Sequence, residues 1–181
     1  VSSAFGVGGG VLGGSDRDAA QLCSVAQELA GRQSVSSIEL RGGHAPSNWT
    51  CVDDKHANFS GPLEQDDEAQ LLAIPRKARA EVRKGLKNEL TVTVGSSHGD
   101  RQSHYEVYSQ SVHNLGTPVF PRSLFDAMLD TFGEDADILT VSADGKPVSS
   151  VLSFYHNGIV MPFWGGGTWA ARNLRANERM Y

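Results

Sequence analysis

The pattern of apolar residues predicts that the chain ends in three antiparallel strands. Apolar residues dominate residues 136–143, a second run that begins at Val148 and a third that begins at Ile159. The pairs Asp144-Gly145 and Asn157-Gly158 separate these runs, and both accept the positive φ angles of two-residue hairpin turns. We therefore predict a strand at residues 136–143, followed by two longer strands joined by a tight turn.

Helical periodicity appears in four other segments, where apolar residues recur at intervals of three and four. These segments are residues 16–31 behind an N-cap at Ser15, the residues from Pro75 to Asn88, residues 100–114 and residues 123–132. Shorter strands are predicted at residues 35–40 and 90–94, with at most two more at residues 49–52 and 56–59, and residues 5–12 are predicted to form a glycine-rich strand or close-packed turn. A last helix is predicted behind an N-cap at Asn177. This order of elements indicates an α+β fold.

The two ends of the chain indicate a fragment. At 181 residues the chain is long enough to bury one core of ordinary size. It begins with Val1 rather than methionine, and it stops at Tyr181 inside the last predicted helix, which is then too short to be stable. We expect a piece of a longer protein, truncated at both ends.

Composition narrows the class of protein. No apolar run approaches the roughly 20 residues that span a bilayer. Cys23 and Cys51 lack metal-ligand spacing, so we predict reduced thiols, no metal site and a cytoplasmic location. Neither a serine nucleophile elbow nor a paired cysteine–histidine motif is present, and the sequence leaves the catalytic residues unknown.

Charge is distributed unevenly. The net charge is −5, but residues 75–88 carry six basic side chains against the single acid Glu81, so this segment holds +5 and the remainder −10. Arginine and lysine bind phosphate groups well, whereas a solvated helix face is the alternative explanation of such a run. The candidates for binding an anionic partner are Arg76, Lys77, Arg79, Arg83 and Lys84.

The last predicted strand ends in Gly165-Gly166-Gly167-Thr168. Glycines let another backbone or a ligand approach closely, and a strand end holds binding residues rigidly. We predict that these glycines and the basic helix form one cradle for a phosphate-bearing partner. The candidates for lining its pocket are Tyr155, Trp164, Gly165, Gly166, Gly167 and Arg172. The alternatives are core packing for the two aromatic residues and a bulge or tight turn for the glycines.

Three stretches resemble a known family. They are IPRKARAEVRKGLKN at residues 74–88, YSQSVHNLGTP at residues 108–118, and Ser153-Phe154-Tyr155 together with Gly165–Thr168. They resemble the FemAB-like proteins associated with exosortase/PEP-CTERM systems, within the GNAT-like acyltransferase superfamily. The resemblance implies an α+β GNAT-like fold, which is a mostly antiparallel curved sheet flanked by helices. It also implies that residues 1–62 are the C-terminal part of a first such domain and residues 63–181 a second domain, incomplete at its C-terminus.

The activity that the resemblance implies is a transfer reaction. An aminoacyl or other acyl group would move onto an amine or hydroxyl of a peptidoglycan or exopolysaccharide precursor, in a bacterial cytoplasm or at the inner face of the membrane. The expected partner is a phosphate-bearing donor or precursor, with tRNA among the candidates and DNA excluded. The alternative is a non-catalytic GNAT-like module that binds an anionic polymer or a protein, and a truncated chain can be inactive although its parent is an enzyme.

The donor expected from the resemblance is aminoacyl-tRNA rather than acyl-CoA. Acetyl-CoA-dependent GNAT enzymes carry an Arg/Gln-x-x-Gly-x-Gly/Ala loop whose amides hold a pyrophosphate at a helix N-terminus. This sequence lacks that loop. The glycines at residues 165–167 are also predicted to precede the next helix by about ten residues rather than to open it.

Overall fold

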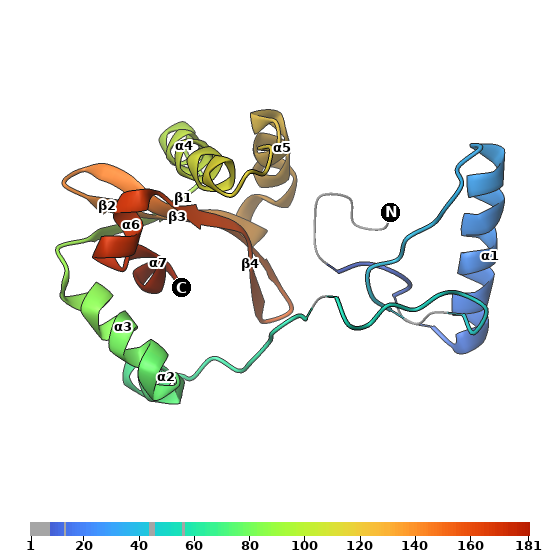
Figure 1. Cartoon of the computed structure of the whole chain (residues 1–181), viewed down its shortest axis with the longest axis horizontal. Coiled ribbons are helices and arrows are strands. Elements are labelled where there is room, and N and C mark those ends of the chain that lie inside the picture. The colour runs from blue at the N-terminus through green and yellow to red at the C-terminus, as the bar shows by residue number, and fades with distance from the viewer. Residues whose placement is uncertain (1–7, 13, 44–45, 56) are drawn as a thin grey trace. The chain divides into compact units, whose positions relative to one another are not determined.

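A computed structural model describes residues 8–12, 14–43, 46–55 and 57–181 (Figure 1). The chain divides into two compact units, Val1–Gly61 and Pro62–Tyr181, each of which is described by itself. Among the described residues, no helix is both long enough and apolar enough to cross a membrane.

Helix α1, Asp16–Arg32, is the regular element among the described residues of the first unit. The predicted N-cap is confirmed: Ser15 Oγ accepts a hydrogen bond from Asp18 N, and the Asp18 carboxylate accepts one from Ser15 N at 2.8 Å. This reciprocal arrangement satisfies two backbone donors at the start of the helix. Ala19 and Cys23 are buried on one face, as the apolar spacing predicts.

The short strands predicted between α1 and residue 60 are wrong where the structure describes them. Residues 35–40, 49–52 and 57–59 pair with no other strand, and His56 lies outside the described residues. A strand persists only where its backbone groups find partners. Val35 N instead donates to Ala30 O at 2.9 Å and closes the end of the helix.

The glycine-rich start of the chain forms a close-packed turn where it is described. Residues 8–12 form no strand, and residues 5–7 lie outside the described residues. A Cβ on Gly10 would overlap the carbonyl oxygen of Gly42. Glycine is required at this crossing of two backbone segments.

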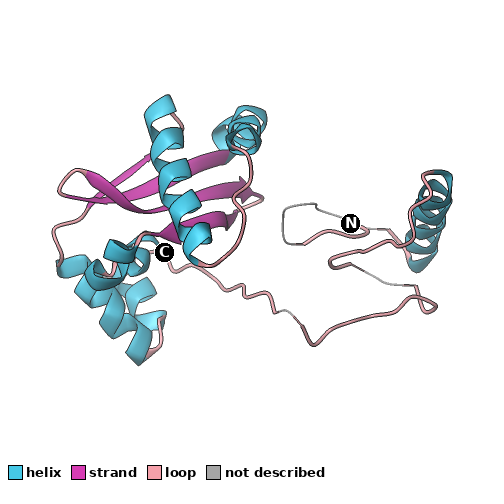
Figure 2. Ribbon diagram, turned by 45° about the horizontal axis from the view of Figure 1, so that its top comes forward, coloured by secondary structure: helices cyan, strands magenta, loops and turns pink. Residues whose placement is uncertain are grey.

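The second unit contains one sheet and the helices around it (Figures 1 and 2). Its elements are α2 (Asp67–Ala73), α3 (Arg76–Lys87), β1 (Thr91–Gly95), α4 (His98–Asn114), α5 (Arg122–Phe132), η1 (Gly133–Asp135), β2 (Ala136–Ala143), β3 (Lys146–His156), β4 (Ile159–Gly167), α6 (Trp169–Leu174) and α7 (Ala176–Met180). The strands lie in the order β1-β2-β3-β4, and every neighbouring pair is antiparallel. The four predicted strands from β1 to β4 and the helices α3, α4 and α5 are confirmed with small shifts at their ends, and the fold class is α+β.

Helices cover both faces of the sheet. Helices α4 and α5 pack on one face, whereas α6 and α7 pack on the other (Figures 1 and 2). Helix α3 lies further out on the second face and packs against α7. The sheet is therefore the middle layer, and its strand ends are held from both sides.

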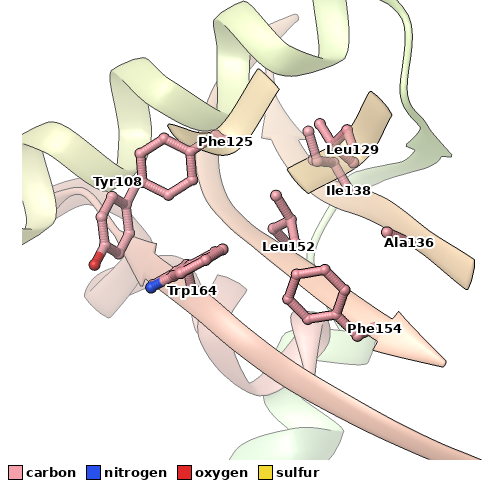
Figure 3. Packing of buried hydrophobic residues seen from close by; sticks show 8 residues of the cluster. All are labelled: Tyr108, Phe125, Leu129, Ala136, Ile138, Leu152, Phe154 and Trp164. Carbon is pink, nitrogen blue, oxygen red and sulfur yellow. The ribbon is translucent and has the colours of Figure 1, made fainter. Parts of the chain in front are cut away.

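Each face of the sheet has its own apolar core. Under α4 and α5 the core is aromatic, and the rings of Phe125 and Trp164 meet edge to face with centroids 5.2 Å apart (Figure 3). This cluster comprises Tyr108, Phe125, Leu129, Ala136, Ile138, Leu152, Phe154 and Trp164. The core under α6 and α7 has smaller side chains, Val141, Val148, Val151, Ala171, Ala176 and Met180. Removing these side chains from water holds the three layers together.

The chain after β4 differs from the prediction. Helix α6 begins at Trp169, directly after the glycine run, and the predicted N-cap at Asn177 is wrong because α7 already begins at Ala176. Arg175 separates the two helices with a left-handed backbone, φ 53° and ψ 36°. Helices this short contain too few apolar repeats for periodicity to reveal them.

Candidate functional site

The glycines that end β4 are packed against the protein's own side chains. A Cβ on Gly166 would collide with Ser111 of α4, and a Cβ on Gly167 would collide with the Asn177 side chain of α7. The first glycine of the run meets the Tyr181 hydroxyl from the same side as α7. Contacts alternate between the two faces because successive strand residues point to opposite sides. The glycines thus let helices approach β4 closely on both faces.

Three backbone donors of the turn between β4 and α6 are already in use. Gly167 N donates to Ser111 Oγ at 3.3 Å, and Thr168 N donates to Val148 O at 2.9 Å. Ala171 N donates to the carbonyl oxygen of Thr168 at 3.1 Å. We call this the closed turn because these three donors are bound within the chain. The hydroxyl oxygen of Thr168 is buried there without a hydrogen-bond partner among the described residues.

The exposed surface next to this turn carries an aromatic platform. Trp169, the first residue of α6, is 56% exposed, and the Arg172 guanidinium lies over its ring at 4.2 Å from the centroid. A cation over an indole ring stabilises the pair and fixes the ring in place. Arg172 was predicted from the sequence, whereas Trp169 was missed. The signal for Trp169 was an aromatic residue directly behind a glycine turn with arginine three positions later.

The other two aromatic candidates have different environments. Trp164 is buried in the core under α4 and does not line an open pocket among the described residues. Its environment is therefore the core packing named as the alternative to a pocket position. Tyr155 is half-exposed, and its hydroxyl donates to both carboxylate oxygens of Asp137 at 3.0 and 3.1 Å. Partial burial and the neighbouring carboxylate raise the pKa of Tyr155, so its phenol stays protonated at neutral pH. Asp137 was not predicted, since nothing in the sequence pairs residues of neighbouring strands in this way.

The basic helix α3 packs against the junction of α6 and α7 through Glu81 and Gly85. Gly85 is buried by the backbone of Arg175, which approaches so closely that a Cβ on Gly85 would lie 2.7 Å from the Arg175 carbonyl oxygen. Glu81 Oε2 forms an ion pair with Arg175 Nε at 2.6 Å. At about 100° per residue, Arg76 and Arg83 lie on the opposite side of the helix from Gly85. The basic stripe therefore faces away from α7.

The predicted cradle of glycines and basic residues is not assembled. The glycines contact α7 from the sheet side, whereas α3 contacts α7 with the face that lacks its arginines. Lys77 is exposed, Lys84 is bound to Glu81 at 2.7 Å, and Arg79 donates to Leu72 O at 3.1 Å. The two groups of candidates are two separate surfaces.

A buried polar chain lies beneath α4. His104 is fully buried, and its Nδ1 lies 3.0 Å from Ser150 Oγ, which in turn lies 3.2 Å from Thr140 Oγ1. His104 Nε2 has no hydrogen-bond partner among the described residues. Burial lowers the pKa of His104 to about 4, so the ring is neutral at physiological pH. The sequence did not distinguish this histidine from the other five.

A polar groove of about 560 Å³ lies between the first turn of α4 and α5. Ion pairs cross it: Arg101 Nη2 lies 2.7 Å from Asp130 Oδ1 and Arg101 Nη1 lies 3.5 Å from Asp126 Oδ1. Arg122 contributes a further ion pair to Asp126 at 3.7 Å. The two arginines balance the two aspartates in charge, and the ion pairs of Arg101 join α4 to α5.

The family described as "Acetyltransferase (GNAT) domain" matches residues 75–181, which is more than half of the chain. The chain belongs to the GNAT acetyltransferase family. The match begins at Pro75 and contains α3, the whole sheet and every helix that packs on it. The prediction of a GNAT-like fold is confirmed.

Among solved structures, the chain is similar to "Crystal structure of FemX" at 14% sequence identity with a TM-score of 0.59. The match covers 64% of this chain and 46% of that chain, so the chain spans less than half the length of FemX. At this identity the similarity shows the fold alone. Comparison with curated proteins gave no match.

Three backbone donors of the β4–α6 turn in this GNAT domain are not free to bind a pyrophosphate such as that of acyl-CoA. Holding a pyrophosphate at a helix start requires backbone N–H groups that point at the ligand. Here the donors of Gly167, Thr168 and Ala171 are bound to Ser111, Val148 and Thr168. The predicted gap of about ten residues before the next helix is wrong, since α6 begins two residues after Gly167.

Proposed function

We propose that this GNAT domain is part of an enzyme that transfers an aminoacyl or other acyl group to an amine or hydroxyl of a cell-envelope precursor. The observation that carries the proposal is the closed β4–α6 turn within a GNAT fold similar to that of FemX. The fold supports acyl transfer, and the engaged donors disfavour acyl-CoA. An aminoacyl-tRNA is the donor that suits this combination.

The proposed reaction balances without an additional reactant. The acceptor nitrogen or oxygen attacks the ester carbonyl of the donor, and the new bond to carbon forms as the bond from carbon to the ribose oxygen breaks. The proton lost by the acceptor is gained by the released ribose hydroxyl. Much of the rate in such a step comes from holding the two reactants in position.

The proposed substrate-binding residues form three groups. Tyr155 presents a protonated hydroxyl beside Asp137 near the β3–β4 turn, at the opposite end of the strand pair from the glycines. At the glycine end of β4, Arg172 holds Trp169 as a flat surface on which a base or sugar ring can stack. The glycines Gly165, Gly166 and Gly167 shape this edge, and Trp164 supports it from the core. On α3, the predicted residues Arg76, Lys77, Arg79, Arg83 and Lys84 bind a phosphate-bearing partner.

The proposed setting is the bacterial cytoplasm or the inner face of the membrane, with a peptidoglycan or exopolysaccharide precursor as acceptor. The association with exosortase/PEP-CTERM systems belongs to the same proposal. We further propose that residues 1–62 are the C-terminal part of a first GNAT-like domain, with the second domain following from residue 63.

A turnover experiment tests this function. The full-length protein is incubated with isotope-labelled aminoacyl-tRNA and with nucleotide-linked and lipid-linked envelope precursors, and products are identified by mass spectrometry. The proposal predicts one precursor that gains the mass of the aminoacyl group at an amine or hydroxyl. Absence of transfer to every precursor, with the protein folded, would contradict it.

The second candidate function is a non-catalytic module that binds an anionic polymer or a protein. The filled space around the glycines and the outward-facing basic helix favour this alternative. It predicts saturable binding of a polyanion in the same experiment without any labelled product.

A further inference from the structure

Helix α3 has two opposite faces with different chemistry. Its inner face meets the α6–α7 junction through Gly85 and Glu81, and Asn88 Nδ2 donates to Leu174 O at 2.6 Å. At about 100° per residue, Arg76, Arg83 and Lys87 lie within roughly 40° of one another and about 180° from Gly85. The outer face is a straight cationic stripe.

The stripe is available on the outside of the unit. Arg76, Arg83 and Lys87 are all exposed, and Lys77 and Lys84 flank them on one side. The single acid of the helix, Glu81, pairs with Arg175 through one carboxylate oxygen and with the flanking Lys84 through the other, and it lies on the side of Gly85. The stripe therefore presents positive charge without an acidic neighbour on the same helical face.

Exposed apolar side chains occur on and beside α3. Leu86 is 46% exposed and lies about 80° around the helix from Arg76, on the side away from Lys77 and Lys84. Leu72, near the end of α2, is 57% exposed, and its carbonyl oxygen accepts a hydrogen bond from Arg79. Cationic residues beside exposed leucines are the chemistry of a helix that lies in a membrane interface, where charges meet headgroups and leucines enter the acyl boundary.

We infer that α3 docks the protein on the surface of an anionic lipid bilayer, through Arg76, Arg83 and Lys87 with Leu72 and Leu86 at the edge. A convex helix face suits a flat, extended polyanion better than a small ligand, which would need a concave site. The remainder of the chain carries a net charge of −10 and is repelled by the same surface, so only the α3 face turns toward the lipid.

This inference goes beyond the proposed transfer reaction and does not depend on it. Vesicle binding is measured without donor or acceptor, so a failure of membrane docking and a failure of turnover are separate results. Docking would hold an enzyme near precursors that a lipid carries, but the interaction itself requires only charge and exposed leucine.

Vesicle flotation tests the docking. The full-length protein is mixed with vesicles of phosphatidylcholine alone and with vesicles that also contain phosphatidylglycerol. We expect flotation only with the anionic vesicles, and its loss as salt shortens the screening length. The variant R76Q/R83Q/K87Q is expected to weaken partitioning about a hundredfold, because each basic residue near an anionic leaflet strengthens it several-fold.

The matched control removes the same charge elsewhere. Arg17, Arg32 and Lys146 are exposed and lie outside α3, so R17Q/R32Q/K146Q is expected to retain partitioning within about threefold of the unmodified protein. Equal losses in the two variants, or no flotation with anionic vesicles, would overturn the inference.

Discussion

His104 shows how a residue without an evident function can control the stability of the unit. Its folded pKa is about 4 because it is buried, whereas an unfolded histidine titrates near 6.5. Below pH 6.5 the unfolded chain gains a proton that the folded protein accepts only near pH 4. The free energy of unfolding should therefore fall as pH drops through this range.

The substitution His104→Gln tests this coupling. At pH 5 the histidine should cost about 2 kcal/mol relative to pH 7.5, and glutamine, which keeps a polar atom for Ser150 but does not titrate, should remove that part of the pH dependence. Urea unfolding followed by tryptophan fluorescence at both pH values measures the difference. Identical pH dependence in the two proteins would show that His104 is protonated without penalty.

Gly166 is the residue at which the close approach of α4 to β4 can be tested. In Gly166→Ala the new methyl group meets Ser111 Oγ and Cβ, and the resulting overpacking should cost about 1–3 kcal/mol of stability. Adding Ser111→Gly should recover part of this loss because it removes the clashing atoms. Gly99→Ala is the control, since a Cβ there has only an ordinary contact with Ser97. Equal stability of Gly166→Ala and the unmodified protein would contradict the packing described here.

At the scale of elements, the contact of α3 with the α6–α7 junction can be tested by a substitution that favours the helix but should destabilise the folded unit. Alanine forms helices better than glycine by about 1 kcal/mol, so Gly85→Ala should stabilise an isolated α3. In the folded unit its Cβ would press on the Arg175 carbonyl oxygen, and a net loss of about 1–2 kcal/mol is expected. Urea denaturation measures the sign. Gly31→Ala in α1, where no atom lies within 4 Å, should not destabilise, and a stabilised Gly85→Ala protein would contradict the packing.

Elements of the second unit were predictable because their signals are local. Amphipathic spacing revealed α4 and α5, and Asn157-Gly158 fixed the β3–β4 turn through its positive φ angles of 49° and 74°. Helix α6 and the absent strand at residues 35–40 were mispredicted, since short segments adopt the structure that their tertiary partners allow.

Details of the site depended on contacts between distant residues. Ser111 of α4 contacts Gly166 of β4, and the hydrogen bond from Tyr155 to Asp137 joins β3 to β2. The sequence therefore predicted glycines at a close approach, but it could not show that α7 separates the glycines from the basic stripe.

For the whole molecule, the structure assigns distinct tasks to the layers of one GNAT domain. The sheet and its two cores hold a closed β4–α6 turn beside the Trp169–Arg172 platform, whereas α3 presents its charge outward. The Trp169–Arg172 platform is proposed to contact the reactants, whereas α3 is proposed to bind both a phosphate-bearing partner and an anionic membrane. Substitutions on α3 are therefore expected to weaken substrate binding as well as membrane binding.

The most direct test of the central claim is a comparison of donors in one transfer assay. The full-length protein receives an envelope precursor with either labelled aminoacyl-tRNA or the corresponding labelled acyl-CoA, and the initial rate of label transfer is measured for each. The closed turn predicts transfer from aminoacyl-tRNA and none above background from acyl-CoA. Saturable transfer from acyl-CoA would show that the turn opens to hold a pyrophosphate, which would contradict this account of the site.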